Sequence, residues 1–534
     1  MRYFIFIFFL SVFALSASLA RAEEYSLDIA RQPVNVTGHP VKKVTVNGTI
    51  PAPTLRFTEG TEATVHVTNH MNVPTSVHWH GILIPGAMDG VDGFNGFQEI
   101  QPGKTFTYRF PIRQTGTYWY HAHSAGQEQD GLYGSLIFAP AGQDPIKTDR
   151  DYVVVLSDFT DEESAQIMGN LKMSSDYYAT ARRTIGDFLG DVRAQGFKKA
   201  WKDAGDWGQM RMARTDLADV TGYTFLINGK SPAQNWTGLF KPGERVRLRF
   251  INASSMSFFD VRIPGLKMKV LQADGQNVEP LEVDEFRFAP AETYDVVVTP
   301  QEDKAYTIAA EPIDRTGFAM GTLATHEGMK SEMPKQRPRA LLTMGDMGGM
   351  DMEGMTMTAA DMKSGWAEAG TPKGDKALNY KDLRYAGIQE DTREPDRTVD
   401  VRLGGNMERY IWTMNGKKFQ DAEPIRLKYG ERVRLNFTNE TMMAHPMHLH
   451  GMFVQLENGQ PAEKLPNKHT VIVPPGQSYS VLLTASEPGE WAFHCHLLFH
   501  MMSGMMNKVV VAKLDAADMP AQTEPSHEGD HHAH

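Results

Sequence analysis

Three stretches of the chain share one pattern of alternating apolar and polar positions. Each stretch begins with a glycine, ends nine residues later with an asparagine, and follows an Asn-Gly pair. The stretches are residues 60–69, 243–252 and 430–439. Strict alternation is typical of a half-buried β-strand, and glycine and asparagine at the ends indicate turns. The repeat therefore predicts an all-β chain with three β-sandwich domains.

Two regions break this pattern. Residues 160–215 mix charged and apolar positions, and Thr160-Asp161-Glu162-Glu163 resembles a helix capping box, which predicts a helical insertion in the second domain. Residues 329–385 contain a segment rich in Met, Gly and Asp without apolar period, which is typical of a flexible linker. The predicted organisation is a signal peptide at 1–22, domains at 23–145, 146–328 and 386–514, the Met-rich linker at 329–385, and a His-rich tail at 515–534.

Composition and charge narrow the function. The chain has 534 residues and a net charge of −11, which argues against a nucleic-acid partner and against binding to anionic membranes. The first residues are apolar and end in Ala20-Arg21-Ala22, which indicates a Sec-type signal peptide and a mature start at Glu23. An uncleaved membrane anchor is the alternative. No other stretch is apolar enough to span a bilayer, so we expect no stable membrane insertion after signal removal.

The only cysteine is Cys495, in the sequence HCHLLFH of residues 494–500. An exported protein meets oxidising conditions, where cysteines usually pair, but one cysteine cannot form a disulfide within the chain. Such a thiol is buried and inert, paired with another chain, or bound to a ligand. The histidines on both sides favour the last alternative.

Four H-x-H pairs occur in the outer two domains, whereas the second domain has Val261-Arg262-Ile263 at the matching offset. Alternate side chains of a strand point to one side, so each pair projects together. The pairs are His78 and His80, His121 and His123, His448 and His450, and His494 and His496. Eight imidazoles are too many for one zinc ion and suit several copper ions. The middle domain is expected to be a spacer that sets the distance and angle between the outer two.

The same alternation points Cys495 away from its histidine neighbours and into the third domain. There it is expected to meet His500, Met505 and His445. Two histidines, a cysteine and a weak thioether are the ligands of a blue-copper electron-transfer site. One tripeptide would then join two metal sites covalently.

The motifs HWHG, HAHS, HPMHLHG and HCHLLFHMMSGM, in this order, resemble those of the multicopper oxidases, and the resemblance spans all three domains. Among the branches of the family, the chain looks most like the periplasmic oxidases of the copper-resistance protein A type. The resemblance implies Greek-key cupredoxin domains and four copper ions per chain. It implies these ligands: His445, Cys495, His500 and Met505 for type 1 copper; His78 and His448 for type 2; His80, His121 and His496 for one type 3 ion; and His123, His450 and His494 for the other.

The resemblance also implies a reaction. Cu(I) or another small reductant would give up single electrons near His500 or His445, and Cys495 would pass them on for the reduction of O₂ to water. Asp89 matches a carboxylate that passes protons in bacterial relatives, and a turn aspartate is the alternative reading. A carboxylate that some relatives have directly after the type 1 histidine is replaced here by Met501, and no acidic group is evident beside the type 1 ligands.

Copper resistance in the periplasm is therefore the expected role, with laccase-like oxidation of phenols as a side activity. The protein is expected to be a monomer, with a periplasmic copper-handling protein as a partner. The alternative is a copper-sequestering protein that uses its Met and His segments. A copper nitrite reductase would not need the second H-x-H pair in each outer domain, and iron or manganese oxidation stays open.

Further methionines and histidines lie outside these motifs. Seven methionines between Met344 and Met362 are expected to recruit Cu(I), because thioethers bind this soft ion. Met442, Met443, Met447, Met501 and Met502 could form a copper route or fill gaps in the core. The tail carries His527, His531, His532 and His534, as a metal-binding end or an inert one. His39, His66, His70, His326 and His469 are expected to have no metal role.

Overall fold

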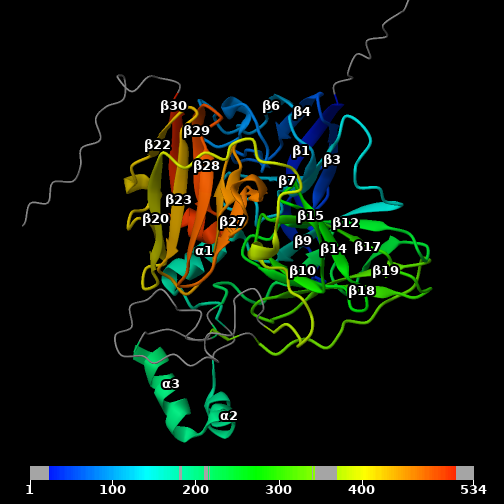
Figure 1. The fold of residues 1–534 in the computed structure, drawn as a ribbon, viewed down its shortest axis with the longest axis vertical. Coiled ribbons are helices and arrows are strands. Elements are labelled where there is room, and N and C mark those ends of the chain that lie inside the picture. The colour runs from blue at the N-terminus through cyan, green and yellow to red at the C-terminus, as the bar shows by residue number, and fades with distance from the viewer. Residues whose placement is uncertain are drawn as a thin grey trace, which may run out of the picture.

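The computed structural model describes residues 23–179, 183–209, 215, 217–339, 341–342 and 370–512. These residues form six β-sheets, which pack in pairs as three sandwiches, so the prediction of an all-β chain with three β-sandwich domains is confirmed. Figure 1 shows the first sandwich in blue beside the third in orange and red, with the second in green beneath the first.

The first sandwich consists of two four-stranded sheets. One sheet has the order β2-β1-β4-β6 and the other the order β3-β8-β7-β5. Its strands are β1 Glu23–Val34, β2 Val41–Val46, β3 Ala52–Thr58, β4 Glu62–Asn69, β5 His78–His80, β6 Thr105–Pro111, β7 Gly116–His121 and β8 Tyr133–Ala139.

The second sandwich has a six-stranded sheet, β10-β9-β12-β17-β14-β15, and a five-stranded sheet, β11-β19-β18-β13-β16. Its strands are β9 Arg150–Phe159, β10 Thr224–Ile227, β11 Trp236–Leu239, β12 Val246–Asn252, β13 Phe259–Arg262, β14 Met268–Ala273, β15 Gln276–Val283, β16 Glu285–Phe288, β17 Thr293–Val298, β18 Tyr306–Pro312 and β19 Ala319–Ala324.

The third sandwich has the same strand order as the second. Its sheets are β21-β20-β23-β28-β25-β26 and β22-β30-β29-β24-β27. Its strands are β20 Arg397–Asn406, β21 Ile411–Met414, β22 Ile425–Lys428, β23 Arg432–Asn439, β24 His445–Leu449, β25 Val454–Leu456, β26 Asn467–Lys468, β27 Thr470–Val473, β28 Ser478–Thr484, β29 Gly489–Cys495 and β30 Met506–Ala512.

The repeated asparagines have one structural task in all three sandwiches. The alternating stretches are β4, β12 and β23, and each ends on its buried asparagine. The side-chain amides of Asn69, Asn252 and Asn439 donate to backbone carbonyls in the loop that follows. Because a buried carbonyl is costly to leave without a donor, this residue fixes the loop that leads to the next strand.

The helices occupy little of the chain. The inserted helices are α1 Ser164–Met173, α2 Ile185–Gln195 and α3 Phe197–Gln209, and α4 covers Leu498–Met502. Figure 1 shows α2 and α3 as a hairpin that projects from the body. Single 3₁₀ turns lie at η1 Gly86–Met88, η4 Tyr380–Asp382, η5 Phe419–Asp421 and η6 Ala462–Lys464.

The helical insertion is confirmed, but the proposed capping box at Thr160 is wrong. The N-cap of α1 is Glu163, whose side chain makes no capping hydrogen bond, and the Thr160 hydroxyl instead accepts the backbone N–H of Glu162. The insertion does contain a capping box, at the start of α2, where Thr184 and Asp187 exchange hydrogen bonds. A short polar run fits a turn as well as a cap, because the same side-chain oxygen accepts a local N–H in both.

Candidate metal centre

The four H-x-H pairs lie on, or at the ends of, strands that pair with each other inside each outer sandwich; His123, His450 and His496 follow the last residues of β7, β24 and β29. In the first sandwich β5 pairs with β7, and His78 lies opposite His121. In the third, β24 pairs with β29, and His448 lies opposite His494. Directly opposed residues of antiparallel strands project to the same face, so each sandwich presents its histidines from one patch of one sheet.

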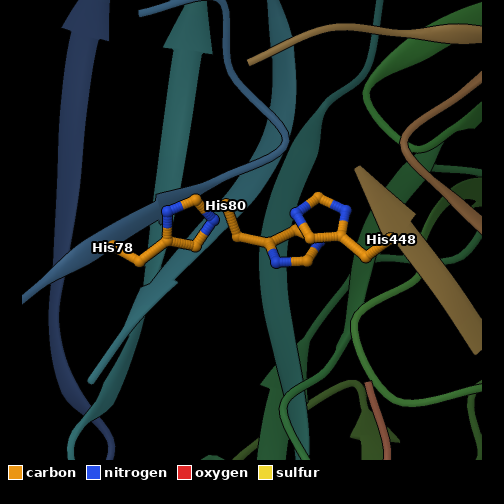
Figure 2. A group of neighbouring side chains, drawn as sticks. All are labelled: His78, His80 and His448. Carbon is orange, nitrogen blue, oxygen red and sulfur yellow. The ribbon is translucent and has the colours of Figure 1, made fainter. Parts of the chain in front are cut away.

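The two patches face each other across the boundary between the first and third sandwiches. The ring of His80 stacks on that of His448, and the ring of His78 stacks on that of His450, each pair with centroids 3.7 Å apart. Figure 2 shows His78 and His80 reaching from the first sandwich toward His448 of the third. The eight rings therefore form one cluster in which both domains take part.

Within this cluster, three sets of histidines hold their ring nitrogens within 4.8 Å of one another. Each set combines residues of both outer sandwiches, so neither domain completes a set alone. The sets are His78, His80 and His448; His80, His121 and His496; and His123, His450 and His494.

In two of the rings, Nδ1 contacts a backbone carbonyl, which leaves Nε2 free to face the cluster. His78 Nδ1 lies 2.9 Å from the backbone oxygen of Asp89, and His448 Nδ1 lies 2.7 Å from the backbone oxygen of His469. Such contacts fix the tautomer, so that Nε2 carries the lone pair.

The remaining nitrogens fit metal ions. Among the described residues, six buried ring nitrogens have no hydrogen-bond partner. One is His469 Nε2, and the other five belong to the three histidine sets: His78 Nε2, His80 Nδ1, His123 Nε2, His448 Nε2 and His496 Nδ1. Burial and the neighbouring imidazoles hold the pKa of His448 well below its usual value, and burial lowers the pKa of His494 to about 4. Neutral imidazoles with unpartnered nitrogens are the donors that copper requires.

A separate set surrounds Cys495. Its Sγ lies 3.5 Å from His445 Nδ1 and 3.8 Å from His500 Nδ1, and these two nitrogens are 3.2 Å apart. Met505 is fully buried, and its backbone N–H donates to the His500 carbonyl. Burial raises the pKa of the Cys495 thiol, and a coordinated cation would favour the thiolate instead.

Asp89 lies inside the histidine cluster. Its carboxylate oxygens are 2.9 Å from His450 Nδ1 and 3.3 Å from His78 Nδ1, and the residue is 1% exposed. Asp89 therefore orients one ring from each outer sandwich, His450 through its carboxylate and His78 through its backbone carbonyl.

Glu128 is a second buried carboxylate that the sequence did not reveal. One of its oxygens lies 2.7 Å from His121 Nδ1, and burial raises its pKa well above the usual value. It occupies the polar run GQEQDG, which reads as a surface loop. No spacing or periodicity marks such a residue, because the fold alone brings this loop against the cluster.

Asp219 is the acidic group that was not evident beside the Cys495 set. Its Oδ2 accepts hydrogen bonds from His500 Nε2 at 2.8 Å and from the Tyr410 hydroxyl at 2.6 Å. Burial raises the pKa of Asp219 to about 7, while the Tyr410 hydroxyl acts in the opposite direction. The indole of Trp412 stacks on the His500 ring with centroids 3.8 Å apart. Asp219 follows the inserted helices in the chain, so its hydrogen bond to His500 connects this segment to the Cys495 set.

His469 also lies against the cluster, although the sequence gave it no role. Its Nδ1 is 3.2 Å from His80 Nε2, and its carbonyl faces His448. It belongs to none of the three histidine sets. By contrast, the rings of His66 and His70 are within hydrogen-bond distance of the carboxylates of Glu24 and Asp28, away from the cluster.

The methionines singled out in the sequence differ in their burial, and some lie outside the described residues. Met442, Met443 and Met447 are buried in the core, and Met501 and Met502 are half-buried. The seven methionines between 344 and 362 and the histidines of the tail lie outside the described residues, as does the expected signal peptide. In the described part of the chain, no helix is long and apolar enough to cross a membrane.

Comparison with known proteins gives consistent matches along the chain. Family profiles described as multicopper oxidase match residues 28–143, 150–328 and 392–515. The chain is 44% identical to copper resistance protein A of Escherichia coli, over 93% of this chain and 94% of that protein. It is 45% identical to a copper resistance protein A homolog of Pseudomonas syringae pv. tomato, over 91% and 92%. Its fold is similar to that of Fet3p, a multicopper oxidase, with a TM-score of 0.70, 19% identity and coverage of 92% and 91%.

Proposed function

Because the chain belongs to the multicopper oxidase family, we propose that it couples the one-electron oxidation of Cu(I) to the four-electron reduction of O₂ to water, and thereby protects the cell from copper. The observation that carries this proposal is the position of Cys495. Its sulfur joins a set with His445 and His500, while the residues on either side of it belong to the large histidine cluster.

The residues present fit the four copper ions of this family. Type 1 copper would be held by His445, Cys495 and His500, with Met505 as the weak fourth ligand. Type 2 copper would be held by His78 and His448. The type 3 pair would be held by His80, His121 and His496 on one side and by His123, His450 and His494 on the other. When bound, copper supplies one-electron redox chemistry at Cys495 and multi-electron chemistry with O₂ at the cluster.

The chain supplies the path between the two centres. Cys495 is bonded through its backbone to His494 and His496, so no through-space gap separates the sulfur from the cluster. All three residues are at least 97% buried, which excludes water from this connection. A fixed, dry connection favours transfer of electrons over side reactions with solvent.

Carboxylates serve the two ends of the reaction. Asp219 accepts the Nε2–H of His500 and thereby fixes the ring at the edge where a reductant would give up its electron. Asp89 is in hydrogen-bond reach of rings from both domains and would hold and pass the protons that O₂ reduction consumes.

Support for Cu(I) as the substrate comes from the relatives, whose names assign them to copper resistance. A small ion also suits a type 1 set that is fully buried, since a large organic molecule would need an open edge there. The remaining parts of the proposal are export to the periplasm, a monomeric state, and the domain boundaries at 23–145, 146–328 and 386–514.

The test is a comparison of wild type with Cys495→Ser. Wild type should contain about four coppers per chain, show an intense blue thiolate–copper band, and consume O₂ when Cu(I) is added. The variant should lose the band and the O₂ consumption, and cells that carry it should lose copper tolerance. Tolerance that persists at the wild-type level in the variant would overturn the oxidase function and favour copper sequestration.

A further inference from the structure

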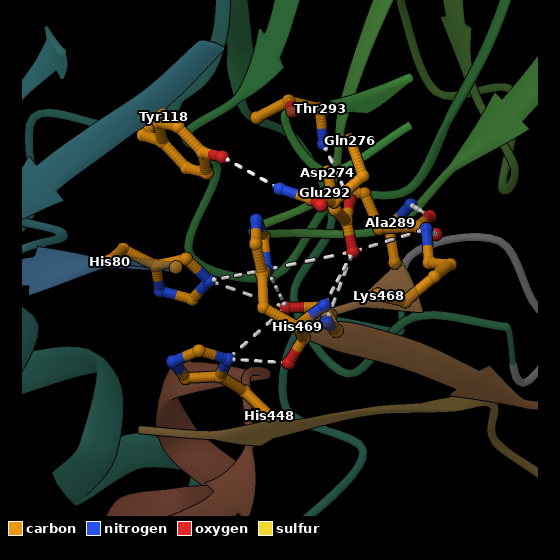
Figure 3. A network of polar contacts seen from close by, with 12 residues as sticks. His80, Tyr118, Asp274, Gln276, Ala289, Glu292, Thr293, His448, Lys468 and His469 are labelled. Atoms are coloured by element: carbon orange, nitrogen blue, oxygen red, sulfur yellow. Dashed lines mark hydrogen bonds and ion pairs between the residues drawn. The ribbon is translucent and has the colours of Figure 1, made fainter. Parts of the chain in front are cut away.

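A network of buried charges lies where all three sandwiches meet, and the proposed reaction does not use it. Lys468 of the third sandwich is fully buried, as are Asp274 and Glu292 of the second. Lys468 Nζ lies 2.6 Å from a Glu292 oxygen and 3.2 Å from an Asp274 oxygen. Figure 3 shows this group beside His469, His80 and His448. Isolated buried charges are costly, so such a set requires close and well-directed partners.

The charges in the network hold each other in place. Burial acts to lower the pKa of Lys468, but the attraction of Asp274 and Glu292 is stronger and raises it. The ammonium also lies over the ring of Tyr380, 5.0 Å from its centroid. Lys468 thus contacts both carboxylates of the second sandwich, and this contact joins the second sandwich to the third.

Asp274 also holds the backbone that follows Lys468. Its Oδ2 accepts the N–H of His469 and the N–H of Thr470, each at 3.1 Å, and its Oδ1 accepts the N–H of Thr293 in its own sandwich. One carboxylate thus fixes two consecutive peptide groups of the neighbouring domain. A second point of attachment lies further along, where the Tyr380 hydroxyl accepts the N–H of Ile472.

The backbone held in this way leads directly to the ligand histidines. The His469 carbonyl faces His448 Nδ1 at 2.7 Å, and Thr470 begins β27, which pairs with the ligand strand β24 with His448 opposite Thr470. The His469 ring is 3.2 Å from His80 as well. A shift of this segment would therefore move the acceptor that sets the orientation of the His448 ring.

Asp274 owes its position to the tip of the hairpin between β14 and β15. Asp274 and Gly275 have φ of 49° and 72°, as a tight turn between two strands requires. The tip also fits closely against the first sandwich, because a Cβ on Gly275 would lie 2.2 Å from the Tyr118 ring, and a Cβ on Gly116 would lie 2.2 Å from the Gly275 carbonyl oxygen. The hairpin is thus wedged between the two domains that share the cluster.

We propose that Asp274 is a positioning residue that orients the His448 ring through the backbone of residues 468–470. The middle domain is then more than a spacer, since it contributes the carboxylate that completes the surroundings of the type 2 copper ligand. This inference rests on the ligand assignment made for the proposed function. Partners of this kind, one step removed from the metal, commonly change metal affinity by about 10- to 100-fold.

The test measures the metal itself, not turnover. Asp274→Asn keeps the size of the side chain and removes its charge. We expect type 2 copper to be lost to a chelator at about 10- to 100-fold lower chelator activity than in wild type. At equal blue absorbance, the EPR signal of type 2 copper should fall relative to that of type 1. Tyr380→Phe removes one hydroxyl only and should give a smaller shift in the same direction. It serves as the second test if Asp274→Asn does not fold.

Asp260→Asn is the matched control, because Asp260 is an equally buried carboxylate that pairs with Arg287 inside the second sandwich alone. It should keep the wild-type ratio of type 2 to type 1 copper. The inference is overturned if Asp274→Asn and Tyr380→Phe both retain type 2 copper with unchanged EPR parameters, or if Asp260→Asn loses it equally. A wild-type protein without any type 2 signal would instead overturn the ligand assignment.

Discussion

The carboxylate of Asp219 accepts a hydrogen bond of 2.8 Å from Nε2 of His500, a residue 281 positions away in the chain. Both side chains are buried, and the opposite nitrogen of the same ring faces Cys495. The pair connects the segment after the inserted helices to the proposed type 1 site. This contact gives the segment after the insertion a place in the site that its own sequence does not indicate.

We expect Asp219→Asn to raise the type 1 reduction potential. A negative carboxylate on the far side of the imidazole favours the more highly charged oxidised metal, and the variant loses this effect. A hydrogen bond to a charged group contributes about 1.5–3 kcal/mol, and about 1.4 kcal/mol corresponds to about 59 mV for one electron. Redox titration of the blue band at pH 8, above the pKa of about 7, measures the shift. An unchanged potential would show that the Asp219 contact does not tune this centre.

Asp89→Asn is expected to separate the two halves of the reaction. Its carboxylate lies near His450 and His78 and is not part of the set formed by His445, Cys495 and His500. Loss of a proton-transfer group typically costs about 10²- to 10⁴-fold in rate. Stopped-flow absorbance should show normal bleaching of the blue band by Cu(I) without O₂, followed by slow recovery when O₂ is added. Equal slowing of both phases would argue for a general defect of the site.

Gly81→Ala is expected to disturb the cluster by direct contact. Gly81 has φ of +80°, and an added Cβ would lie 2.3 Å from Cδ2 of His469, which touches His80. Gly60→Ala is the control, because Gly60 has φ of +81° and open space around the same position. Both variants should lose about 1–2 kcal/mol to backbone strain. Only Gly81→Ala should also lose copper from the cluster, as measured by metal analysis of the folded protein.

Stability should fall at acid pH because of Asp260. Burial acts to raise its pKa, but Arg287 and Arg315 are stronger and lower it to about 2 in the folded state. A depressed folded pKa contributes stability above the unfolded value near 4, and this contribution is lost as the pH falls from about 4 toward 2. The full shift corresponds to roughly 2.5 kcal/mol at about 1.4 kcal/mol per unit, and about 2 kcal/mol of it is lost by pH 2.

Urea unfolding of copper-free wild type and Asp260→Asn at several pH values checks this prediction. The difference in unfolding free energy between the two proteins should be largest at pH 5 and should shrink by about 2 kcal/mol by pH 2. Copper-free protein is needed, since release of metal at low pH would add its own effect. A difference that stays constant with pH would contradict the assigned role of Asp260.

The ligand strands could be read from the sequence because their information is local. Alternation with a period of two fixes which face a side chain occupies, so His494 and His496 had to project together, with Cys495 on the other side. The repeat that ends in Asn69 and Asn439 supplied the equivalence of the outer domains. Together these features determined the all-β fold, the three sandwiches and the grouping of the histidines.

The surrounding carboxylates could not be read in this way. Asp219, Glu128 and Asp274 lie in turns and loops, where no period constrains the direction of a side chain, and polar letters there are typical of exposed surface. The capping box expected at Thr160 failed for a related reason, since a short polar run satisfies several local geometries.

The sequence by itself thus determined the strands, their repeat and the side on which each ligand lies, because strand geometry follows from neighbouring residues. Only the tertiary structure decided which buried charges support those ligands. Contacts such as that of Asp274 with His469 join residues 195 positions apart, and they exist because packing of the three sandwiches removes both groups from water and leaves each as the other's partner.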